Sequence, residues 1–325
     1  MRHAVYFGDN LPILRAMSAE SVDLIYIDPP FNTGTTQRRT QIRTTAVGDS
    51  DGDRTGFGGR RYATTTLGSK AYVDVFDDYL GFLEPRLIEA KRLLTADGTI
   101  YVHLDYRESH YVKVLLDGIF GRACFLNEVI WAYDYGGRGK RRWPAKHDTI
   151  LVYVQDPDNY VFNWDEIERI PYLAPGLVGP EKAARGKVPT DTWFHTIVPT
   201  NGKEKTGYPT QKPVPILKRI VAASSPPDGT VLDFFAGSGT TGEACRLLGR
   251  RFVLVDDNPE ALATMARRFA GIDEVDWVGF DPVACGDIAV PAMRGRRSGP
   301  KATALNRGTR LKPATDVEPP VRESR

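Results

Sequence analysis

The chain has 325 residues, of which 41% are apolar and 26% charged, the balance of an ordinary globular protein with one or two domains. No apolar run approaches the ~18 residues of a membrane span, and the N-terminus lacks the apolar stretch of a signal peptide. The net charge of +2 does not by itself indicate a nucleic-acid partner, and three scattered cysteines without a CxxC pair argue against a disulfide framework or a zinc site. These features predict a cytoplasmic protein with reduced thiols and no metal site.

The first half of the chain alternates strand and helix patterns around one irregular stretch. In chain order they predict a strand at 3–9, a helix at 11–17, a strand at 22–28, a helix from 77 that stops at Gly98, a strand at 99–104 and a helix at 107–121. Residues 34–70 lose apolar periodicity and are rich in Thr, Gly and Arg, which predicts a long mobile loop.

The second half regains the same alternation after an irregular middle. Strands are predicted at 128–134 and 149–155, and Pro and aromatic residues then interrupt the pattern until about Gly207. Helices and strands alternate again in the order helix 213–225, strand 230–235, helix 241–249, strand 251–257 and helix 258–271. Such alternation predicts an α/β fold with a doubly wound, mostly parallel sheet. Residues 291–325 are rich in Arg, Pro, Gly and Lys and predict a basic disordered tail.

One strand of the first half ends in the sequence DPPF, residues Asp28 to Phe31. At the carboxyl end of a strand in an open α/β sheet, side chains face the ligand crevice. Asp28 offers an acceptor there, Pro29 and Pro30 lack N–H groups, and Phe31 offers a flat apolar face. Paired acceptors beside a stacking surface suit a planar amine, such as the exocyclic NH2 of a nucleobase that has left the duplex.

A plain turn at a strand end is the alternative for DPPF, because the bare tripeptide is common in turns. The apolar run VDLIYI before it and the residues FN after it make the motif more specific. Together with a ligand-binding glycine loop elsewhere in the chain, the motif favours a functional site.

That loop is FAGSGTTG, which follows a buried strand and opens a helix. Gly237, Gly239 and Gly242 match G-x-G-x-x-G, and Asp256 ends the next strand, as in dinucleotide sites. S-adenosylmethionine (AdoMet) sites use the same strand-end geometry for a ligand with cationic groups, and should carry a carboxylate such as Asp233 beside the turn. Nothing else in the chain offers a hydride-transfer site. Together with the DPPF motif, this favours AdoMet over NAD.

Three blocks in this order resemble the amino-methylating DNA methyltransferases of the permuted, β-class order. They are GDNLPILRAMSAESVDLIYIDPPFNTG, then TGYPTQKPVPILKRIVAASSPPDGTVLDFFAGSGTTGEAC, then RFVLVDDNPEAL, and they cover most of residues 4–135 and 205–270. The resemblance implies a Rossmann-like AdoMet-dependent methyltransferase sheet. It implies one catalytic domain at 1–135 and 205–290, and an inserted target-recognition region at 136–204.

The resemblance also implies roles for individual residues. Asp28, Pro29, Pro30 and Phe31 would form the target-base site. The implied cofactor site consists of Asp9, Thr210, Gln211, Lys212, Asp233, Phe235, Gly237, Gly239 and Asp256. In this sequence Asp257 stands where the family usually has an apolar residue, so Asp256 and Asp257 could exchange roles.

Double-stranded DNA is the implied partner, and a basic run in the inserted region is the candidate contact. Its cationic residues are Arg138, Lys140, Arg141, Arg142 and Lys146. Lysines and arginines neutralise phosphates, and arginine also reaches guanine edges. A solvated charged face is the alternative for a lone basic run. Residues 34–70 are a second candidate for DNA contact.

The leading functional prediction is a site-specific methyltransferase that acts on N6 of adenine in DNA. Aspartate at position 28 favours adenine, because the cytosine-N4 enzymes of the family often carry Ser-Pro-Pro-Tyr. The alternatives are an N4-cytosine DNA methyltransferase and a non-catalytic nucleotide-binding protein. A cognate restriction endonuclease and a homodimer are possible partners, and the recognition sequence is left open because no code links these side chains to bases. Binding to DNA predicts a location at the nucleoid.

Overall fold

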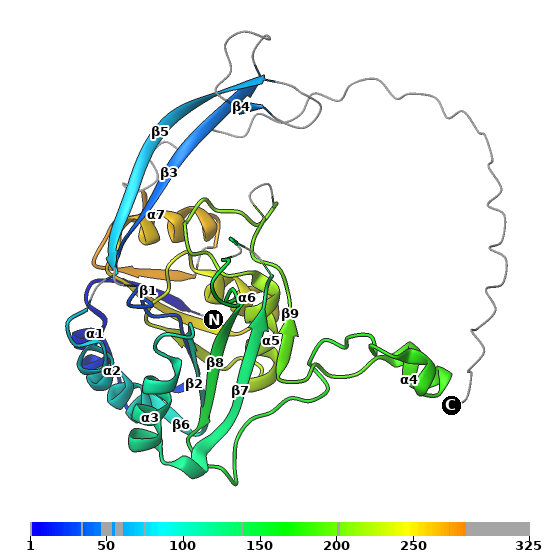
Figure 1. Cartoon of the computed structure of the whole chain (residues 1–325). Coiled ribbons are helices and arrows are strands. Elements are labelled where there is room, and N and C mark those ends of the chain that lie inside the picture. The colour runs from blue at the N-terminus through cyan, green and yellow to red at the C-terminus, as the bar shows by residue number, and fades with distance from the viewer. Residues whose placement is uncertain are drawn as a thin grey trace, which may run out of the picture. The chain divides into compact units, whose positions relative to one another are not determined.

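The computed structural model of the chain centres on one nine-stranded sheet (Figure 1). It describes residues 2–33, 35–46, 54–55, 61–74, 76–134, 136–137, 139–199, 202–272 and 274–283. The basic tail at 291–325, Cys285 and Arg138 therefore lie outside the described residues. Cys124 and Cys245 are free thiols, and no helix among the described residues combines the length and apolar character needed to cross a membrane.

The strands of the sheet follow the order β12–β1–β11–β10–β2–β6–β8–β7–β9. Neighbours from β12 to β6 are parallel, β8 runs antiparallel to both β6 and β7, and β9 is parallel to β7. The bounds are β1 His3–Phe7, β2 Val22–Ile27, β6 Leu94–Leu104, β7 Phe125–Ala132, β8 His147–Val154, β9 Thr192–Phe194, β10 Thr230–Asp233, β11 Arg251–Asp256 and β12 Val275–Val278. The mostly parallel sheet confirms the predicted fold class.

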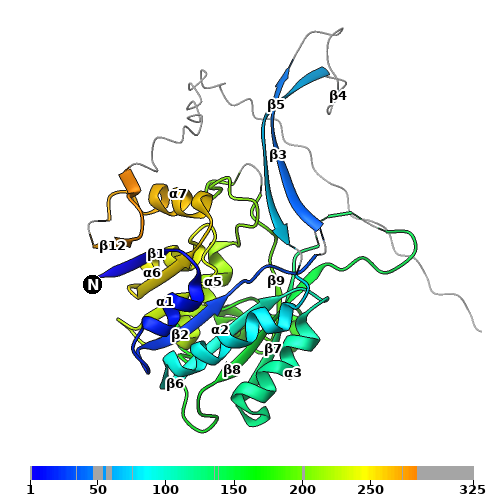
Figure 2. The same ribbon diagram turned by 90° about the vertical axis from the view of Figure 1, so that its left-hand side faces the viewer.

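Helices cover both faces of this sheet, as Figure 2 shows. One apolar cluster packs α5, α6 and α7 against the sheet, and a second packs α1, α2 and α3 against the opposite face. The bounds are α1 Asn10–Ala16, α2 Tyr79–Leu93, α3 Ser109–Phe120, α4 Pro180–Arg185, α5 Val214–Ser224, α6 Thr240–Leu248 and α7 Pro259–Arg268, with 3-10 turns η2 at Arg122–Cys124 and η3 at Pro175–Leu177. Because both faces are covered, central strands such as β2 and β10 place apolar residues on both faces, for example Leu24 and Ile25 in β2 and Val231 and Leu232 in β10.

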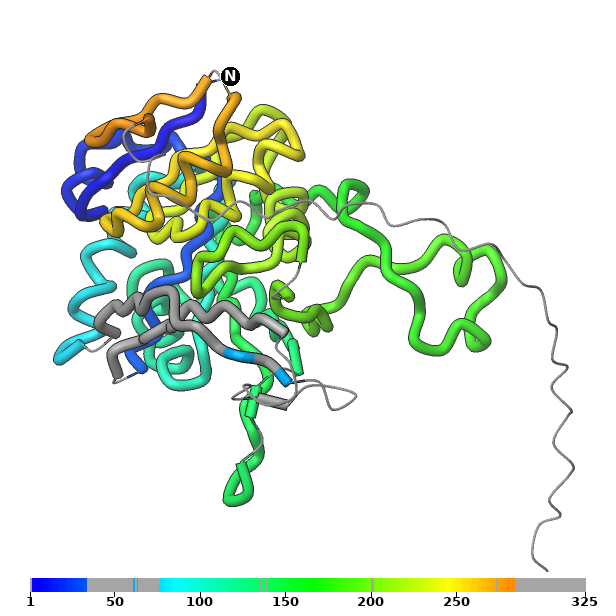
Figure 3. Tube along the Cα trace, turned by 90° about the horizontal axis from the view of Figure 1, so that it is seen from above, coloured from blue at the N-terminus to red at the C-terminus, as the bar shows by residue number. Residues whose placement is uncertain are grey.

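The two ends of the described chain meet at one edge of the sheet. β1 pairs with β12, with His3 opposite Val275 and Tyr6 opposite Val278. Figure 3 shows the blue N-terminal strand beside this orange segment. The N-terminal and C-terminal sequence blocks therefore belong to one sheet, as the sequence predicted.

Two boundaries differ from the sequence prediction. The helix predicted to stop at Gly98 ends at Leu93, because Leu94 adopts an extended backbone and pairs with Val22. Val22 pairs with Leu94 and Leu24 pairs with Thr99. The register shift between these two pairs takes up the residues of β6 that lie between Leu94 and Thr99. The strand predicted at 149–155 is present as β8 at His147–Val154, two residues earlier than expected at its start, and it lies inside the central sheet.

The prediction of a loop over 34–70 is wrong in its secondary structure. β3 at Thr35–Ala46 pairs with β5 at Arg61–Asp74 in an antiparallel ladder, and the short β4 at Arg54–Thr55 adds to β5. Threonine-rich sequence has high β propensity without needing an apolar face, which explains why apolar periodicity gave no signal.

Asn32 holds the base of this hairpin. Its Oδ1 accepts a hydrogen bond from the Phe76 backbone N–H at 3.1 Å, and its Nδ2 donates to Glu108 Oε1 at 2.8 Å. The two chain segments that enter and leave the hairpin are thereby joined directly beside DPPF. Any ligand at Phe31 consequently lies near the root of the β3–β5 hairpin.

Helix α6 packs so closely on the sheet that it requires glycine at position 242. A Cβ there would lie 2.7 Å from Phe269 Cζ and 2.8 Å from Leu254 Cδ1, both buried side chains. We therefore expect Gly242→Ala to lower the free energy of unfolding by about 1–3 kcal/mol through overpacking. Urea unfolding measures the change. The matched control is Gly118→Ala in α3, where a Cβ meets nothing within 4 Å, and where alanine should add about 0.5–1 kcal/mol. Equal effects of the two substitutions would contradict the packing explanation.

Candidate active site

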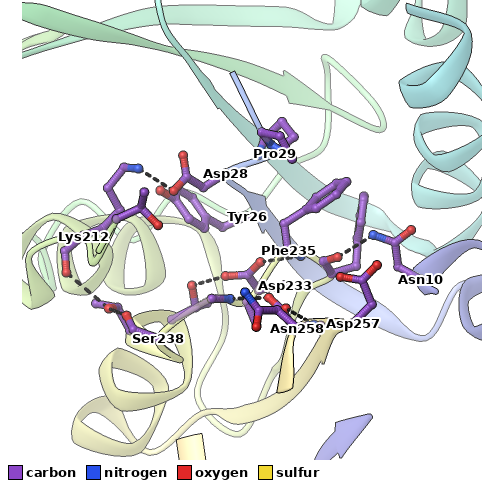
Figure 4. Close-up of a pocket in the computed structure, with 18 of the residues that line it drawn as sticks. Asn10, Tyr26, Asp28, Pro29, Lys212, Asp233, Phe235, Ser238, Asp257 and Asn258 are labelled. Carbon is purple, nitrogen blue, oxygen red and sulfur yellow. Dashed lines mark hydrogen bonds and ion pairs between the residues drawn. The ribbon is translucent and has the colours of Figure 1, made fainter. Parts of the chain in front are cut away.

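A cavity of about 480 Å³ opens at the carboxyl edge of the parallel strands. Its walls come from the ends of four neighbouring strands, β1, β11, β10 and β2, together with α2 and the loop before α5. Figure 4 shows Asp28 and Lys212 on one side, Asn10 and Asp257 on the other, and Asp233 with Phe235 between them. The predicted catalytic residues Asp28, Pro29, Pro30 and Phe31 all line this cavity.

Asp28 stands at the end of β2 and has one occupied and one free oxygen. Lys212 Nζ donates a hydrogen bond to Asp28 Oδ2 and forms an ion pair with it (Figure 4). Asp28 Oδ1 is buried and accepts no hydrogen bond from any described residue. A buried oxygen without a donor is costly, so this atom points to a ligand that brings an N–H or O–H.

Phe31 lies beside the same pair. The Lys212 ammonium lies 5.1 Å from the centroid of the Phe31 ring, within the range of a cation–π contact. The His103 ring, on the inner side, has its centroid 6.0 Å from that of Phe31. The ring of Phe31 is thus held from behind while it remains part of the cavity wall.

A buried polar network behind DPPF escaped the sequence analysis. Tyr26 Oη lies 2.8 Å from His103 Nδ1, His103 Nε2 lies 3.1 Å from Asp148 Oδ2, and Tyr133 Oη donates to Asp148 Oδ1 at 3.2 Å. Burial, with the nearby charges of Asp28 and Asp233, raises the pKa of Tyr26 well above its usual value. Burial alone would raise the pKa of Asp148, but the His103 hydrogen bond and charge hold it below its usual value. Through His103 the network packs against Phe31, and through Tyr26 it forms part of the cavity wall beside Asp28.

The glycine turn after β10 serves two different purposes. Gly237 has φ of +52° and lies in the cavity wall, where a Cβ would come within 3.3 Å of Tyr208 Cε1. Gly239 caps α6 with φ of +70°, and a Cβ there would lie 2.8 Å from Met265 Cγ. Gly239 is not among the residues that line the cavity, and glycine at this position allows close packing of the helix.

Asp233 lies at the centre of the cavity and organises the turn. Its Oδ1 accepts from the Phe235 backbone N–H at 3.0 Å, and its Oδ2 accepts from Thr241 Oγ1 at 2.5 Å. Burial raises the pKa of Asp233 to about 7, with the Asp28 and Asp256 charges adding to the effect. A cation placed beside this carboxyl would favour its ionised form.

The two acids after β11 have different surroundings. Asp256 accepts from the Gly237 backbone N–H at 2.7 Å and from the Asn258 N–H at 2.9 Å, and burial raises its pKa to about 6. Asp257 is exposed and also lines the cavity. Asp256 therefore holds the glycine turn, and both Asp256 and the more exposed Asp257 line the cavity.

The far end of the cavity is built from α1 and α2. Arg86 donates to Asp9 Oδ1 at 2.9 Å and to Asn10 Oδ1 at 2.6 Å, and Asn10 Nδ2 donates to the Phe234 carbonyl at 2.6 Å. The Arg86 guanidinium also stacks 3.9 Å from the Phe82 ring centroid. Sequence analysis found Asp9 but missed Arg86 and Phe82, although their four-residue spacing on a helix is a readable signal.

The loop before α5 supplies Thr210 and Lys212 to the cavity, but not Gln211. Gln211 is buried, accepts from the Thr206 N–H and Oγ1 at 2.8 Å each, and donates to the Glu204 carbonyl at 2.7 Å. Its side chain is therefore engaged within the loop. It fixes the loop that carries its two neighbours into the cavity.

The basic run 136–146 connects β7 to β8 at this same edge of the sheet, because β7 runs parallel to β6. Lys140, Arg141 and Arg142 are exposed, and Trp143 is 95% exposed. Lys146 instead donates to the Gly136 and Gly137 carbonyls at 2.7 and 3.0 Å. The segment therefore presents cations and an aromatic ring on the side of the sheet where Asp28 lies.

Comparison with known proteins places this site in a family. The family model described as DNA methylase (N6_N4_Mtase) matches residues 22–267. The chain belongs to the DNA methylase family. Among its relatives, the methylase is 30% identical over 277 residues to the DNA adenine methyltransferase YhdJ of Escherichia coli, which covers 81% of both chains. It is also 30% identical over 267 residues to the type II methyltransferase M.HpaI of Haemophilus parainfluenzae, with 81% of this chain and 74% of the relative covered.

Solved structures share the fold of the methylase at low sequence identity. The PvuII DNA methyltransferase, described as cytosine-N4-specific, superposes with a TM-score of 0.56 at 15% identity, over 88% of this chain and 91% of the other. The M1.HpyAVI–SAM complex superposes with a TM-score of 0.53 at 21% identity, over 82% and 98% of the two chains. These likenesses confirm the architecture.

The buried carboxyl of Asp233 gives the methylase a distinctive dependence of stability on pH. Its folded pKa of about 7 exceeds the unfolded value, so the folded state binds more protons and loses stability as pH rises through that range. We expect Asp233→Asn to gain stability relative to wild type by about 2 kcal/mol between about pH 5 and pH 8. Urea unfolding of both proteins at the two pH values measures the difference. A difference that is independent of pH would show that Asp233 is ionised throughout.

Proposed function

We propose that this chain transfers the methyl group of AdoMet to the exocyclic N6 of an adenine that has been extruded from double-stranded DNA at a specific sequence. The observation that carries the proposal is the buried, unpartnered Oδ1 of Asp28. It lies beside the Phe31 ring, in the same cavity as the glycine turn and Asp233. Membership of the DNA methylase family supports it.

The Asp28 end of the cavity suits a planar aromatic amine. Asp28 and the carbonyl of Pro29 supply acceptors, and proline at positions 29 and 30 supplies no competing N–H. Phe31 provides a face on which a base can stack. Since a base inside a duplex cannot reach such a pocket, the target must first leave the stack.

The chemistry of the remaining lining residues fits AdoMet. Asp233 suits the cationic amino group, Asp257 suits ribose hydroxyls, and Asp9 at the far end suits the amino group of the cofactor's adenine. Phe82 and Phe235, whose ring centroids lie 6.1 Å apart, provide apolar surface between them. Gly237 lets the backbone approach the ligand closely, and Lys212 with Thr210 would receive the carboxylate of the methionine moiety.

AdoMet supplies an electrophilic methyl group on a sulfonium. Asp28 and the Pro29 carbonyl hold the two amino hydrogens of the target, so that the nitrogen lone pair is directed away from the ring plane. In the transfer, the N6–methyl bond forms as the sulfur–methyl bond breaks, and one N6 proton leaves to Asp28 or to solvent. None of these steps needs a covalent enzyme intermediate, and neither described cysteine lines the cavity.

Adenine is favoured over cytosine by the relatives and by Asp28. YhdJ, at 30% identity, is described as a DNA adenine methyltransferase. The N4 amine of cytosine has the same chemistry, and a protein described as cytosine-N4-specific shares the fold. N4-cytosine methylation is therefore the second candidate function.

DNA would be held along the edge that carries the basic run 136–146. Lys140, Arg141 and Arg142 are exposed there and can neutralise phosphates. The exposed ring of Trp143 adds a stacking or wedge surface. Lys146 stabilises the loop through the two glycine carbonyls rather than contacting DNA directly.

The proposed setting is the cytoplasm, at the nucleoid, where chromosomal DNA is the substrate. Relatives described as type II methyltransferases, M.HpaI and M.ScaI, support a restriction–modification context with a cognate endonuclease. A palindromic site needs two transfers, which a homodimer or two successive monomers can supply. Analytical ultracentrifugation with and without DNA separates these two arrangements.

Incubation of the purified protein with labelled AdoMet and mixed DNA, followed by nucleoside analysis, tests the function. We expect label in N6-methyladenine, and methylome sequencing of a host that expresses the chain should map one recognition sequence. Label in N4-methylcytosine would establish the second candidate, and no transfer to any base would contradict the proposal.

Replacing the acceptor at the target site should separate binding from chemistry. We expect Asp28→Asn to lower the transfer rate at least about a hundredfold, because the anionic acceptor is lost, while the AdoMet dissociation constant changes little. Calorimetry and single-turnover kinetics measure the two quantities. The matched control Asp158→Asn changes an exposed acid at the opposite edge of the sheet and should leave both unchanged. Full activity of Asp28→Asn would remove the catalytic role from Asp28.

The basic run should contribute to the salt dependence of DNA binding. The double substitution Lys140→Ala with Arg141→Ala should reduce the slope of log K against log salt by about one to two units, since each lost phosphate contact removes about 0.9. Fluorescence anisotropy with a duplex at several salt concentrations measures the slope. Arg15→Ala, at the exposed end of α1 near the amino edge, is the control. An unchanged slope for the double variant would place DNA elsewhere.

A further inference from the structure

The Lys212 ammonium lies where the target amino group is proposed to bind. It donates to Asp28 Oδ2 and lies 5.1 Å from the Phe31 ring centroid, so it contacts both the acceptor and the stacking face (Figure 4). Both side chains of the ion pair are largely buried, with 12% of Lys212 and 16% of Asp28 exposed. A base cannot use the Asp28 carboxylate fully while this pair is intact.

The residues that line the cavity include more acidic than basic side chains. Its described lining residues include five acids, Asp9, Asp28, Asp233, Asp256 and Asp257, but only two cations, Arg86 and Lys212. Arg86 is committed, because its guanidinium donates to Asp9, to Asn10 and to the Phe82 carbonyl. A ligand that carries its own carboxylate into the cavity therefore has Lys212 as its available counter-ion among the described lining residues.

Hydrogen bonds hold the backbone around Lys212 in place, independently of the ion pair that its side chain makes. Its carbonyl accepts from Thr240 Oγ1 at 3.2 Å at the start of α6, and the preceding Gln211 is locked by its bonds to Thr206 and Glu204. Nζ donates a hydrogen bond to Asp28, and a lysine ammonium has three donors on a flexible four-carbon stem. Lys212 can thus exchange partners without movement of the loop.

We propose that Lys212 is a positioning residue that couples the cofactor site to the target-base site. In the arrangement of this structure, Lys212 neutralises Asp28 and occupies the base site. When the carboxylate of the cofactor's methionine moiety is present, Lys212 pairs with it, and both Asp28 oxygens become available to the adenine amino group. This inference rests on the proposed function and adds an order to it: the cofactor binds before the base is captured.

The coupling is reciprocal, because a base that binds Asp28 displaces Lys212 toward the cofactor site and so tightens cofactor binding by the same factor. The two carboxylates compete for one cation, and the base amino group takes the place that the cation leaves. Lys212→Met removes the competitor. Asp28 is then accessible without cofactor, and the coupling should disappear.

Capture of the base can be followed without any methyl transfer. A duplex with 2-aminopurine in place of the target adenine of the mapped recognition sequence gains fluorescence when that base leaves the stack. S-adenosylhomocysteine keeps the carboxylate but has no methyl group or sulfonium charge. S-adenosyl-3-thiopropylamine is the same molecule without its carboxylate. Comparison of the two therefore isolates the group that Lys212 is proposed to recognise.

For the wild-type protein we expect saturating S-adenosylhomocysteine to increase base capture on the order of tenfold, and S-adenosyl-3-thiopropylamine to have little effect. Lys212→Met should capture the base equally with either ligand or with none, and Lys212→Arg should retain the wild-type difference. Lys218→Met, at an exposed position of α5, controls for the loss of one positive charge. Calorimetry ensures saturation of each variant, and thermal melting verifies that it is folded.

Equal stimulation of the wild-type protein by the two ligands would overturn the proposal, whatever the behaviour of the variants. Persistence of the S-adenosylhomocysteine effect in Lys212→Met would overturn it as well. These outcomes are distinct from failure of the proposed function, which would appear as a wild-type protein that methylates no DNA.

Discussion

The parallel pairing of β2 with β10 is the constraint on which the site depends. Val231 lies opposite Leu24, and Leu232 lies opposite Ile25, so the two strands end side by side although they come from opposite ends of the sequence. Asp28 and Asp233 follow directly from those ends and meet in one cavity. Because both strands are covered by helices on each face, their pairing is held by apolar packing, and the acids at their tips are held in place by the core.

The electrostatics of that cavity are unfavourable without a ligand. Burial raises the pKa of Asp233 to about 7 and that of Asp256 to about 6. The negative charge of Asp28 contributes to the raised pKa of Asp233. Backbone N–H groups of Phe235, Gly237 and Asn258 offset part of this cost. A cationic ligand beside Asp233 and an N–H donor beside Asp28 would relieve the rest.

Local signals in the sequence were sufficient for much of this picture. The strand-turn motifs DPPF and FAGSG each reveal a strand end with its own chemistry, so Asp28, Phe31, Asp233 and Gly237 could be named in advance. The contact between Lys212 and Asp28 spans 184 residues and depends on the tertiary fold, which no local pattern encodes. For the same reason the sequence did not reveal that Gln211 holds its loop through Thr206 and Glu204, or that Gly239 allows close packing against Met265. The β3–β5 hairpin escaped because strands rich in threonine and arginine lack apolar alternation.

The most direct test of the account is a crystal structure of the protein with S-adenosylhomocysteine and a duplex that carries the recognition sequence. The account predicts an adenine outside the helical stack, with its ring on Phe31, its amino group hydrogen bonded to the Asp28 carboxylate, and its N6 facing the sulfur across open space. A target base that remains paired in the duplex, or an Asp28 pocket that protein atoms separate from the sulfur, would contradict it.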